Sequence, residues 1–252
     1  AQNRLQILLY GDCLAMKILA VDTTAAAASV ALCEDGFLCG EYYVNIKQTH
    51  SQTIMPMAVS LLKSCGVEIK DIGLIAVSAG PGSFTGVRIG VAAAKGLALP
   101  FNIPCASVSS LEALATNLIG TNAVICSVMD ARRNQFYNAI FENVGDKLNR
   151  LTPDRAIAFT ELEKEISDIV LSGKRLILVG DGAKICYNNL NGRTNAEIAP
   201  FNLRFAHASS VAAVGAKLYN AGKTISAEEL IPFYLRLPQA ERELKRRKGF
   251  DV

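Results

Sequence analysis

The chain has 252 residues, of which half are hydrophobic and 19% are charged, and its formal net charge at neutral pH is +3. This length suits one large or two small domains with a substantial core, and the near-balanced charge excludes nucleic-acid binding driven by net charge alone. Seven cysteines without a Cys-x-x-Cys pair predict reduced thiols and a cytoplasmic location. The sequence contains no apolar run of membrane-spanning length, so we expect no membrane partner.

The N-terminal third predicts strands followed by a helix. Residues 1–15 differ in character from the rest of the chain, and we expect either a non-native leader or a poorly ordered extension. Strands are predicted over 18–22, 28–33 and 37–44, the last two joined by a hairpin at Glu34-Asp35-Gly36. Asp22 ends the first strand, where it either supplies a ligand group or caps the turn.

Two apolar helices are predicted next. The first covers 50–65, where Pro56 predicts a kink or a position in the first turn, and the second covers 87–99 after a strand over 74–79. Both have apolar arcs wider than one sheet-facing stripe requires. Two interpretations are open: the helices share an exposed patch for a protein partner, or each is buried on two sides.

A glycine-rich loop, Gly80-Pro81-Gly82-Ser83-Phe84-Thr85-Gly86, precedes the second helix. It nearly fits two phosphate-binding motifs and matches neither. A dinucleotide fingerprint needs glycine where Thr85 stands, and a Walker loop needs lysine where Val87 follows Gly86. Free N–H groups at a helix start favour an anion, whereas glycines at positive φ also build a tight turn, so both interpretations stay open.

The second half repeats the order of the first. A strand over 123–129 ends in Asp130 and is followed by a strand over 135–142, and a later strand over 176–179 precedes Gly180-Asp181-Gly182. This repeat predicts a duplicated domain. We expect an N-terminal lobe, a C-terminal lobe, a helix that packs back on the first lobe, and an extended basic tail, over 16–106, 107–206, 207–221 and 223–252. The tail either contacts RNA phosphates or is a solvated terminus.

Five stretches together resemble the bacterial TsaB family, also called YeaZ. They are the start Met16-Lys17-Ile18-Leu19-Ala20-Val21-Asp22-Thr23-Thr24, the helix start His50-Ser51, the loop region 78–90, Asp130-Ala131-Arg132, and Val179-Gly180-Asp181-Gly182. The likeness covers 16–236. The run Gly-Pro-Gly-Ser-Phe-Thr-Gly is highly specific.

This resemblance implies an α/β fold of two duplicated actin-like, Hsp70-like lobes with mixed, ribonuclease H-like sheets flanked by helices. It also implies a role in forming N6-threonylcarbamoyladenosine beside the anticodon of tRNAs that read codons starting with A. In that family the chain is an accessory subunit. It pairs with TsaD, the catalytic paralogue that binds metal and the threonylcarbamoyl-adenylate, and works with the ATPase TsaE. It meets tRNA through this complex and forms a homodimer when alone.

The residues support a non-catalytic role. The paralogue uses a histidine pair on the helix that starts here at His50, where this chain has Ile54 one turn on. Actin-like kinases carry a glycine after the strand-end acid, where this chain has threonines. We therefore expect no catalytic residue, no metal, no cofactor and at most weak nucleotide binding at a vestigial anion site. Its residues would be Asp22, Thr23, Gly80, Gly82, Ser83, Asp130, Gly180 and Gly182.

By the same resemblance, the pairing surface lies on the two apolar helices. The residues expected to contribute are Met55, Val59, Leu62, Val87 and Val91. A glutamate at Leu62 or Val87 should then abolish pairing and leave the fold intact. The alternative function is an ATP-dependent small-molecule kinase that uses Asp22 and Asp130, which ATP turnover by the isolated chain would reveal. A glycoprotease has little support, because no Ser/His/Asp set or zinc motif is suggested.

Overall fold

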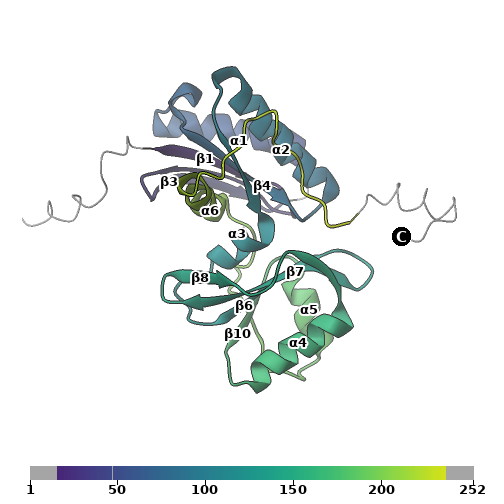
Figure 1. Ribbon diagram of the computed structural model, residues 1–252. Coiled ribbons are helices and arrows are strands. Elements are labelled where there is room, and N and C mark those ends of the chain that lie inside the picture. The colour runs from purple at the N-terminus through teal and green to yellow at the C-terminus, as the bar shows by residue number, and fades with distance from the viewer. Residues whose placement is uncertain (1–15, 47, 237–252) are drawn as a thin grey trace, which may run out of the picture.

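The computed structural model describes residues 16–46 and 48–236, which form two α/β lobes joined at a waist (Figure 1). The expected leader, 1–15, and the end of the predicted tail, 237–252, lie outside the described residues. Each lobe has its own sheet and its own hydrophobic core. The predicted two-lobed α/β architecture is therefore confirmed.

The first lobe contains a five-stranded sheet in the order β3-β2-β1-β4-β5. The antiparallel part is formed by β1 (Lys17–Asp22), β2 (Ala28–Glu34) and β3 (Phe37–Val44), while β4 (Leu74–Gly80) and β5 (Cys105–Ser109) pair parallel to β1 and to each other. The central strands β1 and β4 are almost entirely buried. Their near-continuous apolar sequence fits a position between two helical layers.

Helices cover both faces of this sheet. Helix α1 (His50–Cys65), which continues through Pro56, and helix α2 (Phe84–Ala98) pack on one face. Helix α6 (Ala208–Asn220), from the far end of the chain, packs on the other face. There Gly215 lies against Ala76 of β4, where an added Cβ would come within 2.6 Å of the alanine Cβ. The glycine thus permits α6 to approach the sheet closely.

The second lobe repeats this arrangement in the order β8-β7-β6-β10-β11. Its strands are β6 (Val124–Asp130), β7 (Gln135–Val144), β8 (Lys147–Arg150), β10 (Leu176–Val179) and β11 (Glu197–Ile198). As in the first lobe, the first three strands are antiparallel and the last two are parallel to the first. The sheet order therefore confirms the internal repeat predicted from the sequence.

The remaining elements complete the second lobe and the waist. Strand β9 (Arg155–Ala158) pairs with β7, and helices α4 (Phe159–Leu171) and α5 (Ala183–Leu190) pack on one face of the sheet. Helix α3 (Ser110–Thr116) packs on the other face at the waist, in a core with Ile125. The sequence did not predict β8, β9, α5 or β11, all of which are short.

Helix α2 begins three residues earlier than predicted, at Phe84 instead of Val87. The reason is a side-chain cap: the Ser83 hydroxyl accepts a hydrogen bond from the Gly86 N–H at 3.3 Å. The last three of the seven residues of the glycine-rich stretch, 84–86, are therefore helix rather than open loop. The number of backbone N–H groups that remain for a ligand is correspondingly smaller.

Candidate functional site

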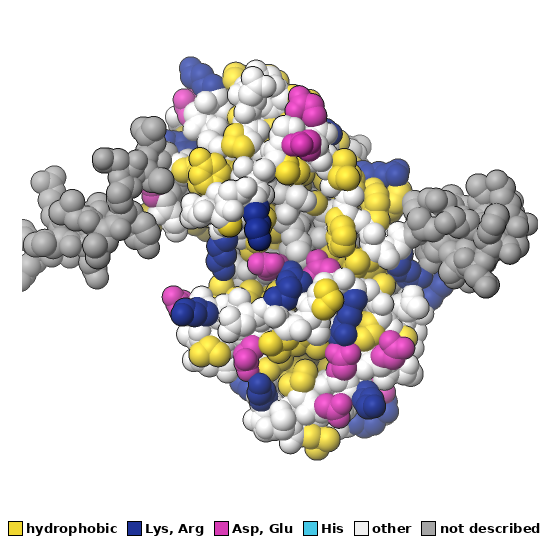
Figure 2. Space-filling view, viewed as in Figure 1, with side chains coloured by type: hydrophobic (Ala, Val, Ile, Leu, Met, Phe, Trp, Pro, Cys, Tyr) yellow, Lys and Arg dark blue, Asp and Glu magenta, His cyan; other side chains and the backbone are white. Residues whose placement is uncertain are grey.

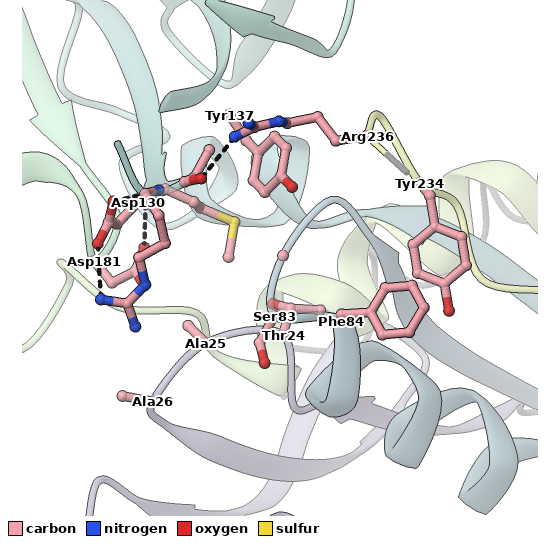
Figure 3. Close-up of a pocket in the computed structure, with 14 residues that line it drawn as sticks. Thr24, Ala25, Ala26, Ser83, Phe84, Asp130, Tyr137, Asp181, Tyr234 and Arg236 are labelled. Atoms are coloured by element: carbon pink, nitrogen blue, oxygen red, sulfur yellow. Dashed lines mark hydrogen bonds and ion pairs between the residues drawn. The ribbon is translucent and has the colours of Figure 1, made fainter. Parts of the chain in front are cut away.

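A cleft of about 440 Å³ lies between the lobes (Figure 3). Thr24, Ser83 and Phe84 line it from the first lobe, and Asp130, Tyr137 and Asp181 line it from the second. The strand-end acids Asp22 and Asp130 both lie near it because the first strand of each sheet ends at the waist. Of the residues predicted for the vestigial site, Gly82, Ser83 and Asp130 line this cleft, and Asp22, Thr23, Gly80, Gly180 and Gly182 do not.

On the first-lobe side, Asp22 is engaged by the turn that comes directly after it. Its Oδ1 accepts hydrogen bonds from the N–H and the hydroxyl of Thr24, both at 3.0 Å. The residue is 1% exposed and does not line the cleft. Burial raises the pKa of its carboxyl above the ordinary value, against the opposing effect of the nearby Ser78 and Thr24 groups. Asp22 therefore caps the turn that follows β1, which favours the capping interpretation over a ligand group.

The space beside the predicted first-lobe glycines is filled by the protein's own backbone. A Cβ added at Gly82 or Gly86 would collide with the carbonyl oxygen of Thr24 or Thr23, and one at Gly80 with that of Phe233. The Ser83 N–H donates to the Thr24 carbonyl at 2.7 Å, and the Thr23 hydroxyl donates to the Gly86 carbonyl at 2.7 Å. The glycines therefore serve close backbone packing, and this favours the tight-turn interpretation over the anion cradle.

On the second-lobe side, the acids are more open to the cleft. Asp130 Oδ1 accepts from the Arg132 N–H at 2.8 Å, and its Oδ2 lies 3.4 Å from the Arg132 guanidinium. Asp181 accepts from the Asp130 N–H at 3.3 Å. Burial raises the pKa of Asp181 to about 6, with the Asp130 charge adding to the effect. Gly180 and Gly182 pack against the β6 backbone, as their first-lobe counterparts do.

The C-terminal segment closes one end of the cleft. Phe233 donates its N–H to the Ala79 carbonyl at 2.7 Å, so the segment continues along the first lobe. The Tyr234 ring stacks on Phe84 with a centroid distance of 4.6 Å. Two residues further, Arg236 donates to the Ala131 carbonyl in the second lobe at 2.7 Å. This segment therefore connects the two lobes across the cleft, as Figure 3 shows.

The predicted pairing residues divide into an exposed and a buried set. Met55 and Val59 on α1 are 38% and 60% exposed. Leu62, Val87 and Val91 are 8% or less exposed and belong to the core of the first lobe, so placing them on a pairing surface was wrong. The prediction failed because part of the wide apolar arc of each helix packs against the sheet and the neighbouring helix instead of facing solvent.

The burial of these residues changes the expected effect of two substitutions. A glutamate at Leu62 or Val87 would bury a charge without a partner in the first core, which costs several kcal/mol, so loss of the fold is expected instead of loss of pairing alone. Val59 is the residue on α1 where a glutamate can remain in solvent. Val59→Glu therefore replaces Leu62→Glu as the substitution that tests pairing.

His50 is held by the protein backbone. Its Nε2 lies 2.7 Å from the Ala25 carbonyl, so the ring is engaged as a structural polar group at the start of α1. Within 16–46 and 48–236, no group of three or more His, Cys, Asp or Glu side chains is placed to hold a metal ion. In the same described ranges, no helix has the length and apolarity needed to cross a membrane.

Two features at the cleft were missed by sequence reasoning. The turn between β6 and β7 has positive φ at three successive non-glycine residues, Arg132, Arg133 and Asn134. In addition, Arg88 on α2 lies 3.8 Å from the Phe84 ring centroid and donates to the Tyr234 hydroxyl at 2.9 Å. The first feature has no sequence signal besides Asn134, and the second joins residues 146 positions apart in the chain.

Comparisons with known proteins agree with this architecture. Residues 44–244 match a family model described as TsaD, tRNA N6-adenosine threonylcarbamoyltransferase. The chain is 31% identical over 223 residues to the tRNA threonylcarbamoyladenosine biosynthesis protein TsaB of Escherichia coli, covering 88% of this chain and 95% of that protein. It is 39% identical over 146 residues to the TsaB of Bacillus subtilis, covering 58% of this chain and 64% of that protein.

A solved structure shares the fold. The structure of YeaZ from Pseudomonas aeruginosa superposes with a TM-score of 0.73 at 24% identity, covering 87% of this chain and all of that one. Two lobes with one strand order around a shared cleft place this chain in the actin-like class of α/β proteins. Within that class, it belongs to the TsaB family, also called YeaZ.

Proposed function

We propose that the chain is a non-catalytic partner subunit of the machinery that forms N6-threonylcarbamoyladenosine in tRNA. Its relatives are named for the biosynthesis of this nucleoside, and the matching family model describes the transferase that attaches the threonylcarbamoyl group to N6 of adenosine in tRNA. In this proposal the chain pairs with a TsaD-type transferase and works with a TsaE-type ATPase. Alone, it pairs with a second copy of itself through the same surface.

The exposed apolar face of α1 and α2 is the observation that carries this proposal. Met55 and Val59 project from α1 into solvent, and partly buried apolar residues of α2 adjoin the same helix layer: Ile89, Ala93 and Leu97. Figure 2 shows hydrophobic side chains over the upper lobe in the view of Figure 1. A contiguous apolar face beside small residues suits close helix packing against another chain.

The cleft supports the same proposal. The first-lobe glycines are in contact with the Thr23 and Thr24 carbonyls, so a triphosphate has little room to approach the backbone there. Asp22 is buried and bonded to Thr24. The alternative, a small-molecule kinase, would require both features to rearrange. ATP turnover by the isolated chain, lost on Asp130→Asn, would favour that alternative.

The decisive experiment is reconstitution of tRNA modification with a TsaD-type transferase, a TsaE-type ATPase and a threonylcarbamoyl-adenylate source, with and without this chain. We expect modification to require the chain and to tolerate Asp22→Asn. Val59→Glu should lower both modification and pairing, measured by light scattering, because it places a charge in the apolar face. Leu171→Glu is the matched control, since Leu171 is 83% exposed in the second lobe.

The outcomes separate the two functions. Equal loss with Val59→Glu and Leu171→Glu would remove the argument that the α1 and α2 face mediates pairing. Modification that proceeds without the chain would contradict the proposed role altogether. A chain that pairs normally but loses modification on Asp22→Asn would assign chemistry to the first lobe. Circular dichroism of each variant excludes unfolding as the cause.

A further inference from the structure

Aromatic and arginine side chains from three separate parts of the chain lie at or beside the cleft. Phe84, Arg132 and Tyr234 line it, Arg88 is bonded to Tyr234, and Arg133 is the exposed neighbour of Arg132 in the chain; we name these five residues the cleft rim. Phe84 and Arg88 come from the start of α2, the next two arginines from the β6–β7 turn, and Tyr234 from the C-terminal segment. Figure 2 shows Lys and Arg side chains around the waist, with acidic side chains between them.

On the first-lobe side, the rim is a preformed stack. The Phe84 and Tyr234 rings lie 4.6 Å apart at an interplanar angle of 26°. The Arg88 guanidinium covers the Phe84 ring at 3.8 Å and is fixed by its bond to the Tyr234 hydroxyl. Tyr234 remains 37% exposed. A fixed ring beside a fixed guanidinium offers a flat apolar surface next to a positive charge, with little side-chain entropy left to lose.

On the second-lobe side, the rim is a strained turn that presents two arginines. Arg132, Arg133 and Asn134 have φ values of 64°, 57° and 56°, an arrangement that costs free energy in non-glycine residues. The turn is retained by bonds from the Ala131 N–H to the Gln135 carbonyl at 3.0 Å and from the Phe159 N–H to the Asn134 carbonyl at 3.1 Å. The Arg132 side chain is nevertheless 86% exposed. The fold thus maintains a strained turn that presents this charged side chain to solvent.

The acidic groups are less exposed than Arg132. Asp181 is largely buried and accepts from the Asp130 N–H, and the Asp130 side chain is 23% exposed, is bonded to the Arg132 N–H and lies 3.4 Å from the Arg132 guanidinium. The most exposed charge of the cleft lining on this side is therefore the positive charge of Arg132, while the two carboxylates are more buried. This charge distribution does not fit a free nucleotide whose phosphates lie beside the buried carboxylates. It fits a chain of phosphates that lies beside the exposed arginines, with a base against the aromatic rings.

We propose that the cleft rim binds a single-stranded segment of RNA, with one unpaired base against the exposed Tyr234 ring, which Phe84 supports, and backbone phosphates at Arg88, Arg132 and Arg133. Stacking on aromatic rings combined with arginine contacts to phosphates is the common way that proteins hold unpaired nucleotides. The inference rests on the proposed function, which supplies tRNA as the substrate of the assembly. It assigns this chain a direct contact with that RNA.

Fluorescence anisotropy of a labelled tRNA anticodon stem-loop tests the inference, with a fully paired RNA of equal length as comparison. The full chain is measured alone and in complex with a TsaD-type transferase. We expect the stem-loop to bind more tightly than the duplex. Arg132→Gln with Arg133→Gln should weaken binding about tenfold or more and lower the salt slope by about 0.7 for each phosphate that is no longer neutralised. Tyr234→Leu should weaken it about fivefold or more.

The charge-matched control is Lys147→Gln with Lys164→Gln, which removes two exposed lysines on β8 and α4 of the second lobe, outside both the rim and the α1 and α2 face. Unchanged RNA affinity of the double arginine variant in the complex would overturn the inference. So would RNA binding that depends only on residues 237–252, tested by ending the chain at Arg236, or displacement of the RNA by ATP. Loss of pairing instead of RNA affinity would make the rim a protein contact and also overturn it. The effect of Val59→Glu on pairing tests the proposed function separately.

Discussion

The two lobes form the same hydrogen bond after their first strand and bury it differently. In the first lobe, Asp22 accepts from the N–H two residues on at 3.0 Å, and in the second lobe Asp130 does the same at 2.8 Å. Asp22 is 1% exposed, whereas the Asp130 side chain is 23% exposed. The repeat therefore keeps the hydrogen bond and changes the access of solvent to it.

The glycines later in each lobe show a difference at one position. A Cβ at Gly86 would collide with the Thr23 carbonyl oxygen, and one at Gly180 would collide equally with the Val128 carbonyl oxygen. A Cβ at Gly182 would lie 3.0 Å from the Asp130 nitrogen. The second-lobe turn is thus as tight as the first at Gly180 and has slightly more space at Gly182. The strand-end acid of the first lobe is therefore a buried structural group, while that of the second lobe is a polar group that lines the cleft.

The glycine difference predicts the largest effects on stability. Gly86→Ala should lower the free energy of unfolding by about 3 kcal/mol, because backbone atoms must move to make room. Gly182→Ala should cost less, about 1–2 kcal/mol. Gly96→Ala is the control on the same helix, since nothing lies within 4 Å of its added Cβ, and it should gain about 0.5–1 kcal/mol. Urea denaturation checks all three, and equal losses at Gly86 and Gly182 would contradict the comparison.

The strand-end acids predict the next largest difference. Asp22→Ala leaves the buried N–H and hydroxyl of Thr24 without their acceptor and should cost about 1–3 kcal/mol. Asp22→Asn keeps an acceptor and removes a group whose pKa burial raises, so it should be as stable as the parent at neutral pH. Asp130→Ala should cost about 0.5 kcal/mol, because solvent replaces the lost bond. Denaturation of the three variants at neutral pH decides whether the difference in solvent exposure between Asp22 and Asp130 accounts for the difference in stability lost on their substitution.

Much of this architecture could be predicted because the signals were local. The hairpin at Glu34-Asp35-Gly36, the helix over 50–65 and the strand that ends at Asp130 are direct consequences of hydrophobic periodicity and turn residues. The repeated order of strand, acid and glycine turn was sufficient to infer two lobes. Short elements such as β8 and α5 were missed because four to eight residues carry too little periodicity.

The site was less accessible to sequence reasoning because its contacts are long-range. The Arg88 bond to Tyr234 and the Arg236 bond to Ala131 join residues more than a hundred positions apart. Periodicity also cannot tell which part of an apolar arc faces solvent. This is why Val59 was placed correctly on the exposed face and Val87 was not.

The raised pKa of Asp181 predicts a pH effect specific to the second lobe. Because burial raises this pKa to about 6, the folded state binds more protons than the unfolded state between the ordinary value of 3.8 and 6. The unfolding free energy should therefore fall as pH rises through this window. Asp181→Asn should remove that part of the slope and raise stability at neutral pH by up to about 2 kcal/mol. Urea denaturation from pH 4 to pH 8 checks this, and an unchanged slope in the variant would contradict the assignment.

The polar contacts of one strand in each lobe, the edge strand β3 and the inner strand β7, predict the smallest effect. In the first lobe, Glu41 of β3 pairs with His207 at 3.2 Å and accepts from the Ser209 N–H at 3.0 Å at the start of α6. In the second lobe, the neutral Asn143 of β7 accepts from the N–H groups of Gly120 and Asn122. Only the first of these two arrangements depends on pH.

The bond to Glu41 raises the pKa of His207 above 6.5, against the opposing effect of burial. The stability from this pair is therefore fully present below pH 6.5 and is lost as pH rises through the raised value, by about 1 kcal/mol. Glu41→Gln should flatten this part of the profile, whereas Asn143→Ala, which introduces no titratable group, should lower stability equally across this pH range and leave the slope unchanged. If the free energy of unfolding of Glu41→Gln still declined above pH 6.5, another group would be titrating. The Glu41–His207 pair would then not be a pH-dependent difference between the two lobes.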